Sequence, residues 1–407
     1  MTCPGCGQAA EFQGYRPKTP LSLFGPVRCQ RAYYCCHRCG QGLCPWDEQA
    51  GLTAGRLTAG AERLVSLAGL LGDSFEEAAE RTLPELCGLR LAEGTVRRTT
   101  EEAGRRLGQR RHAGGTWGAA RPWAWHTDAH GRTCAYVSVD LTAVRQQAPG
   151  GGPADARMPY VAAVYNPAPV PPAADNAAEG PRPRMQARYL AGLYDLDELG
   201  LQLRRQAAQV GMEAAQVWIA LSDGGSGLER FLQRNFNRPD LVVILDFWHA
   251  AGYLEELARA WHPKDAEAAA ALAQAWCHTL KHQGGTALLA ELRGLALPRG
   301  KPAVRQAHTT AVGYLERNEH RTDYPRYRAN GWEIGSGPVE SACKTVVGQR
   351  LKLAGMRWRS RGRIASAICA PCSRANAVSG RRSGTQVAIN DRFCYRRILV
   401  PHRSTEA

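Results

Sequence analysis

Thr133-Cys134-Ala135-Tyr136-Val137-Ser138-Val139-Asp140-Leu141 is the stretch that decides the predicted fold. Most of its residues are apolar, so we predict a buried strand with Asp140 at its end. Outward from it, similar patterns predict strands at 160–165, 188–193, 217–221 and 241–245, and helices at 195–210 and 227–235. The order is therefore three strands, helix, strand, helix, strand.

A second acid, Asp223, closes the fourth predicted strand in Ser222-Asp223-Gly224-Gly225. Strands often end in Asp because it suits turns, so neither aspartate alone indicates a site. This strand order is the layout of a ribonuclease-H-like α/β domain, in which the first and fourth strands lie side by side. We therefore expect Asp140 and Asp223 to share divalent metals. Carboxylates suit magnesium or manganese, and two such ions can promote phosphodiester cleavage.

Asp246 follows the fifth predicted strand in Asp246-Phe247-Trp248-His249 and competes with Asp223 for the role of second acid. We favour Asp223 because the fourth strand is the one expected beside the first. Asp246 and His249 are then supporting residues that bind metal directly or brace the site. A lone His is also often structural, so both interpretations of His249 stay open.

A third acid, Glu340, lies in Gly335-Ser336-Gly337-Pro338-Val339-Glu340-Ser341-Ala342-Cys343-Lys344, just inside a predicted helix. Basic residues follow it, and the next acid is Asp391. Solvated helix faces usually alternate both signs of charge. The pattern instead favours a metal-binding carboxylate at the edge of a surface that binds phosphates.

Composition agrees with a polyanionic partner. The 407 residues carry a formal charge of +15, and the sequence pI is about 9.4; both are typical of proteins that bind nucleic acid. No apolar run approaches the roughly 20 residues of a membrane-spanning helix. The N-terminus lacks the pattern of a signal peptide, so we expect a cytoplasmic protein without membrane contact.

The first 44 residues hold seven of the 14 cysteines. Two CxxC pairs, Cys3/Cys6 and Cys36/Cys39, have the spacing of a structural zinc site. Gly7 and Gly40 follow the pairs and supply tight turns. A redox CxxC would need a strand-helix-strand setting that is missing here. We therefore predict a zinc ribbon in which Zn²⁺ folds the module and performs no chemistry.

Residues 52–112 read as helices. Within them, 92–100 resembles the second helix of a helix-turn-helix, with Arg97 and Arg98 exposed to DNA. Short helical hairpins of this composition are also common without DNA, so both interpretations stay open. Residues 250–314 predict a helical insertion before Glu340. The aromatics and arginines of 324–332 either stack on bases or pack in the core.

Together these segments resemble a bacterial insertion-sequence transposase with a DDE catalytic core, of the ISKra group. The resemblance rests on the two cysteine pairs, 137–140, 221–224, 246–249 and 335–352. It implies a metal-binding triad of Asp140, Asp223 and Glu340 that holds two Mg²⁺ or Mn²⁺ ions. It also implies a homo-oligomer assembled on terminal inverted repeats, in the bacterial cytoplasm at the nucleoid. Water would free a 3′-hydroxyl at the element's end, and that hydroxyl would attack target DNA. Residues 1–112 would recognise the ends. Residues that would hold phosphates beside the active site are Lys344, Arg350, Lys352 and Arg357.

After about Arg359 the resemblance stops. Cys369-Ala370-Pro371-Cys372 places a proline where the family continues a helix. Our hypothesis is that the reading frame shifted here and left a divergent basic tail and an enzyme that has lost activity. The coding DNA tests it, because a second frame should encode the missing helix.

The predicted organisation has six parts: a zinc ribbon (1–50), a helical DNA-binding module (51–115), the core strands (125–249), a helical insertion (250–330), the catalytic helix (331–360) and the tail (361–407). Two other functions stay open. One is a catalytically inactive or domesticated DNA-binding protein derived from a transposase, and the other is a structure-specific nuclease such as a junction resolvase.

Overall fold

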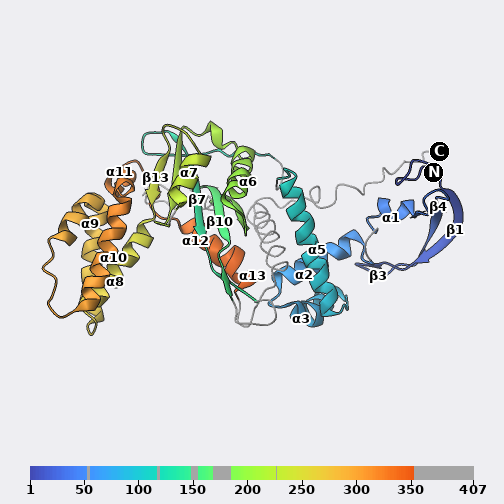
Figure 1. Cartoon of the computed structure of the whole chain (residues 1–407), viewed down its shortest axis with the longest axis horizontal. Coiled ribbons are helices and arrows are strands. Elements are labelled where there is room, and N and C mark those ends of the chain that lie inside the picture. The colour runs from blue at the N-terminus through green and yellow to red at the C-terminus, as the bar shows by residue number, and fades with distance from the viewer. Residues whose placement is uncertain (53–55, 117–119, 148–154, 168–184, 226, 353–407) are drawn as a thin grey trace, which may run out of the picture. The chain divides into compact units, whose positions relative to one another are not determined.

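The computed structural model describes residues 1–52, 56–116, 120–147, 155–167, 185–225 and 227–352 (Figure 1). They form two compact units, one of residues 1–109 and one that begins at Arg110. The boundary lies within helix α5 (Glu93–His112). Arg357, at the end of the predicted catalytic helix, and the divergent tail with its Cys369/Cys372 pair lie outside the described residues.

The first unit opens with a small antiparallel sheet. Its strands, in the order β1-β4-β5, are β1 (Glu11–Lys18), β4 (Cys29–Cys35) and β5 (Gly42–Leu43). A hairpin of β2 (Leu21–Ser22) and β3 (Gly25–Pro26) interrupts them, and helix α1 (Pro45–Gln49) follows. Lys18 and Arg31 both pair with Asp47, which ties α1 to the sheet.

The rest of the first unit is helical, as predicted. Its elements are α2 (Ala59–Leu71), α3 (Phe75–Glu77), a π-helical turn (Ala78–Thr82), α4 (Leu83–Cys87) and α5. Ser74 caps α3 by accepting a 2.9 Å hydrogen bond from the Glu77 N–H, which is the expected role of serine before an acidic turn. Val65, Leu83 and Val96 are among the buried residues of a shared core.

The second unit is built on a mixed sheet in the order β11-β10-β7-β12-β13. The strands are β6 (His126–Thr127), β7 (Thr133–Leu141), β10 (Tyr160–Asn166), β11 (Gln186–Gly192), β12 (Val217–Ser222) and β13 (Val242–Leu245). β6, β10 and β11 run antiparallel to their neighbours, whereas β7, β12 and β13 are mutually parallel. A separate pair consists of β8 (Val144–Gln146) and β9 (Asp155–Arg157). All five predicted strands are confirmed, and the first and fourth are neighbours as expected.

The two faces of β7 have different roles because side chains alternate along a strand. Ala135, Val137 and Val139 join the core beneath α6 (Leu196–Gln209) and α7 (Leu228–Asn235). Tyr136, Ser138 and Asp140 point to the opposite face. On that face the Tyr136 hydroxyl accepts a 3.4 Å hydrogen bond from the Glu333 N–H, near the start of the predicted catalytic helix.

The chain then enters a helical insertion of α8 (Phe247–Trp261), α9 (Ala266–Arg293), α10 (Pro302–Asn318) and α11 (Tyr324–Ala329), which pack together (Figure 1). α9 is kinked at Gly284, where φ is 87°. A Cβ on Gly285 would collide with the side chain of Thr322. Glycine at this kink therefore lets the start of α11 approach α9 closely.

The third predicted acid lies on a helix formed by α12 (Gly337–Ala342), a π-helical segment (Cys343–Gly348) and α13 (Gln349–Leu351). Before this helix, Tyr324, Tyr327 and Trp332 are buried. Of the two interpretations of these aromatics, core packing is therefore correct and base stacking is wrong. Among the described residues, none of the helices combines the length and apolar character needed to cross a membrane.

Candidate functional site

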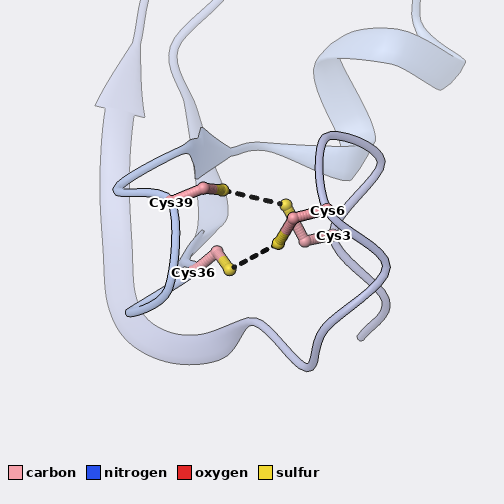
Figure 2. A group of neighbouring side chains, drawn as sticks. All are labelled: Cys3, Cys6, Cys36 and Cys39. Atoms are coloured by element: carbon pink, nitrogen blue, oxygen red, sulfur yellow. Dashed lines mark hydrogen bonds between the residues drawn. The ribbon is translucent and has the colours of Figure 1, made fainter.

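The four cysteines of the two CxxC pairs converge in the first unit (Figure 2). Cys3 Sγ lies 3.6 Å from Cys39 Sγ, and Cys6 Sγ lies 3.5 Å from Cys36 Sγ. All four sulfurs lie within 4.8 Å of one another. Zinc with bonds of about 2.3 Å in a tetrahedron places its sulfurs roughly 3.8 Å apart. The group could therefore bind a structural zinc, as the spacing predicts, and the module is compatible with a zinc ribbon.

The backbone around these cysteines favours thiolates. The Gly7 N–H donates to Cys3 O at 2.9 Å and the Gly40 N–H to Cys36 O at 2.8 Å, with φ near 70° at both glycines. The N–H of Cys39 is the main reason that the pKa of Cys36 falls to about 6. At Cys39 the N–H of Gln41 lowers the pKa, but the neighbouring sulfurs and burial together raise it to about 12. Four crowded thiols therefore cannot all ionise without a cation.

On the second unit, Asp140 lies near each of the other two predicted acids, Asp223 and Glu340. Ser222 pairs with Val139 in the parallel register of β12 and β7. One residue further along each strand are Asp223 and Asp140, so the register brings the two acids opposite each other. Strands lie about 4.8 Å apart, which makes Asp140 and Asp223 close neighbours. Asp246 follows β13, one strand further from β7.

Asp140 is a half-buried carboxylate with two donors. Leu141 N–H donates to Oδ1 at 2.7 Å, and the Cys343 thiol donates to Oδ2 at 3.4 Å. Burial raises the pKa of Asp140, the charge of Asp223 raises it further, and His249 opposes the rise. Cys343 lies one helical turn after Glu340, so its contact also holds the helix that carries Glu340 against β7.

Glu340 is likewise half-buried. Burial raises its pKa, as do the charges of Asp246 and Asp140, whereas Lys344 and His249 oppose the rise. Burial is the largest cause of the raised pKa of both Asp140 and Glu340, and the charges of neighbouring carboxylates add to it; a bound cation would favour the ionised form of both.

The three acids are more widely spaced than the cysteines. Of the residues that the structure describes, the four cysteines are the one group of three or more ligand side chains gathered within 4.8 Å. A single magnesium with bonds of about 2.1 Å keeps its ligand oxygens within roughly 4.2 Å of one another. The donor set is all carboxylate, which is the ligand chemistry of magnesium or manganese, but the three side chains are not gathered closely enough to share one ion as they stand.

Asp246 has a different role from the three acids. Its carboxylate is 1% exposed. Oδ1 accepts from the N–H groups of Trp248 (2.7 Å) and His249 (3.2 Å), and Oδ2 accepts from the N–H (3.0 Å) and hydroxyl of Ser336. With four donors around it, Asp246 caps α8 and ties it to the turn before Glu340. Of the two roles considered for Asp246, the contacts favour bracing.

The insertion also positions Asp223, through a residue that the sequence did not reveal. Arg321, 2% exposed, donates to Ser222 Oγ at 3.0 Å, to Asp223 O at 3.3 Å and twice to Asn318 Oδ1 (2.6 and 3.1 Å). The Tyr314 hydroxyl accepts from the Gly224 N–H at 3.1 Å. The backbone of the Asp223 turn is therefore held by α10 and the residues just after it.

His249 is exposed and lies near a pair of stacked tyrosines. The rings of Tyr253 and Tyr314 are 4.2 Å apart, and the His249 ring is 5.7 and 5.8 Å from them. Because its charge acts on both Asp140 and Glu340, His249 faces the acids and is available to a ligand there.

An open cleft of about 540 Å³ joins acids and bases. Asp140 and Glu340 line it together with Lys344, Gln349 and Lys352. Lys344 and Lys352 are exposed, and the Lys352 ammonium also donates to Thr142 Oγ1. Arg350 on α13 is half-buried. In the first unit, Arg97 and Arg98 are exposed on α5, as predicted. Neither a protein-family model nor a curated protein matches this chain.

Proposed function

We propose that this protein is a DDE transposase, which cleaves DNA at the ends of an insertion element and joins those ends to target DNA. In this proposal the mixed sheet of the second unit is a ribonuclease-H-like catalytic domain. The observation that carries it is the register of β7 and β12, which sets Asp140 opposite Asp223, with Glu340 brought to the same edge by α12.

Each side chain of the site has a task in this reaction. Asp140, Asp223 and Glu340 hold the divalent cations, and Asp246 keeps α12 in place. Lys344 and Lys352 bind phosphates of the scissile strand in the cleft. His249 contacts a phosphate oxygen or one of the carboxylates. When bound, Mg²⁺ or Mn²⁺ supplies a Lewis acid that lowers the pKa of attacking water and stabilises the leaving oxygen.

The first unit would supply DNA recognition. Its cysteine group could hold zinc, and α5 exposes Arg97 and Arg98. The first unit holds none of the three proposed catalytic acids. Its sheet would be stabilised by zinc and its helix α5 is basic, so this unit is suited to bind the terminal inverted repeats. A homo-oligomer on two such repeats would bring both ends to one complex.

The test is Mg²⁺- or Mn²⁺-dependent cleavage of DNA that carries the element's own terminal repeat. Wild type is compared with Glu340→Gln and with the control Glu256→Gln, which removes an exposed carboxylate on α8. We expect cleavage at the repeat end by wild type and the control, and at least a hundredfold loss in Glu340→Gln.

Two outcomes would contradict the proposal. Cleavage that Glu340→Gln leaves unchanged would exclude Glu340 from the triad. Specific binding of the repeat without cleavage by wild type would instead favour the inactive DNA-binding derivative. In that case the divergent tail (361–407) is the first segment to replace, with the sequence that the second reading frame encodes.

A further inference from the structure

Trp248 is a large aromatic side chain that the fold leaves in solvent. It is the second residue of α8, and 65% of its surface is exposed. The backbone N–H of Trp248 donates to Asp246 Oδ1, which fixes the backbone at this position. A Cβ on Gly335 would come within 2.8 Å of indole Cδ1. The indole therefore lies against the turn that leads to Glu340, and its remaining surface is open.

Two cationic side chains and two histidines lie together on α9 and α11. We call Lys281, His278, His282 and Arg328 the α9–α11 cationic cluster. The rings of His278 and His282 stack with centroids 4.3 Å apart. Arg328 Nη1 lies 3.2 Å from His282 Nδ1. Because a guanidinium can only donate, His282 Nδ1 is the acceptor and this imidazole is neutral.

The surroundings of His282 are uniformly positive. Its pKa is lowered by burial and then by His278, Arg328 and Lys281. Within the described residues, the charged groups that act on it are all cationic. Surface cations normally alternate with carboxylates. A bound anion reduces the electrostatic repulsion within such a cluster.

Phe247 connects the exposed indole to the cluster. The ammonium of Lys281 is 5.8 Å from the centre of the Phe247 ring. The same buried ring contacts Trp248 edge-on at 5.4 Å. Trp248 is in turn adjacent to His249, which faces the acids of the cleft. The indole and Lys281 of the cationic cluster therefore contact the same buried ring, and the chain continues from the indole directly to His249.

We propose that Trp248 and the α9–α11 cationic cluster bind an unpaired strand of DNA beside the cleavage centre. The indole stacks on one unpaired base, and Lys281 and Arg328 bind the phosphates of adjoining nucleotides. An exposed indole can stack only on a base whose own face is not already stacked. Inside a paired duplex both faces of each base are stacked, whereas an unpaired strand leaves them accessible. The inference rests on the proposed function, because the strand is the one that the acids cleave.

Binding in EDTA tests this site without requiring cleavage. The zinc-loaded full-length protein would be titrated onto fluorescent duplexes that differ only in three unpaired nucleotides at one end. EDTA would be added just before each titration and zinc content checked after it. We expect the unpaired end to bind more tightly, and Trp248→Ala to reduce that preference by about tenfold. Trp248→Phe should keep most of the preference, whereas Trp248→Leu should behave as Trp248→Ala.

The cationic cluster is tested by salt dependence. Lys281→Gln with Arg328→Gln should lower the slope of log affinity against log salt by about 1 to 1.5. The control, Lys301→Gln with Arg305→Gln, removes two exposed charges at the start of α10 instead. It should leave the slope for the unpaired end nearly unchanged.

Three results would overturn the inference: no preference for the unpaired end, equal binding by Trp248→Ala and wild type, or equal effects of the two double variants. Tighter Trp248-dependent binding of the same sequence as RNA would also overturn it, in favour of an RNA site. Loss of the proposed function would read differently. The cleavage assay tests the proposed function: it fails if Glu340→Gln cleaves as wild type does. The EDTA titration tests the strand-binding site, and its result does not depend on cleavage.

Discussion

Replacing Arg321 tests how the helical insertion holds the Asp223 turn at the edge of the sheet. The guanidinium makes four hydrogen bonds, to Asn318, Ser222 and Asp223, and lies 3.7 Å from Glu229. Arg321→Met leaves those acceptors without their donor inside the protein. Breaking a buried charged network on one side costs about 3–5 kcal/mol. Arg321→Lys keeps the charge but loses the planar fork, so we expect about 2–3 kcal/mol.

Urea unfolding followed by tryptophan fluorescence measures this cost. Apart from Trp46, the tryptophans in the described residues belong to the second unit, so the signal reports on that unit. The matched control is Arg317→Met, which removes an exposed arginine one turn earlier on α10. We expect the control to stay within about 0.5 kcal/mol of wild type. If Arg321→Met cost no more than the control, the network would not hold the Asp223 turn.

Three further predictions concern other parts of the chain. Asp246→Asn should destabilise the second unit by about 2–4 kcal/mol in urea unfolding, because its amide would face the donors of Ser336; an unchanged midpoint would contradict the bracing role. Burial raises the pKa of Glu333 to about 7 from an ordinary 4.5. The native state therefore prefers the protonated form, and stability should fall by about 2–3 kcal/mol as pH rises from 4.5 past 7. Glu333→Gln should abolish this loss and match wild type at pH 4.5, and parallel pH profiles of the two proteins would refute the assignment. Cys36→Ser should reduce bound zinc from one ion per chain to none by elemental analysis and unfold the first unit, as seen by limited proteolysis, while the second unit survives.

The strands of the catalytic sheet could be predicted because each is a short apolar run with clear ends. The order of strands and helices, compared with the ribonuclease-H-like layout, then predicted that the strands ending in Asp140 and Asp223 are neighbours; their register came from the structure. The cysteine group could be predicted because CxxC spacing fixes two ligands of each pair locally. The strands and the cysteine group could be predicted because short stretches of sequence determine them.

Long-range contacts could not be predicted in the same way. Arg321 is one arginine among many, and its bonds to Ser222 and Asp223 span about a hundred residues. The aromatics of 324–332 had the composition of a stacking surface, yet the kink at Gly284 draws α11 onto α9 and buries them. Trp248, by contrast, stays exposed although it adjoins a buried Phe247. Which of two aromatic groups faces solvent depends on helix packing that no short window of sequence contains.

The link between Asp246 and Ser336 also has a consequence for the order in which the protein is made. The proposed DNA-reading module is complete at about His112, whereas Glu340 and its anchor come more than two hundred residues later. At about 5–20 residues per second, that gap takes roughly ten seconds or longer. Under the proposed function, a nascent chain would therefore be able to bind its own element's DNA before it could cleave it. An unfinished chain near the gene that encodes it would therefore not cleave DNA, because cleavage would have to wait until Glu340 has been synthesised.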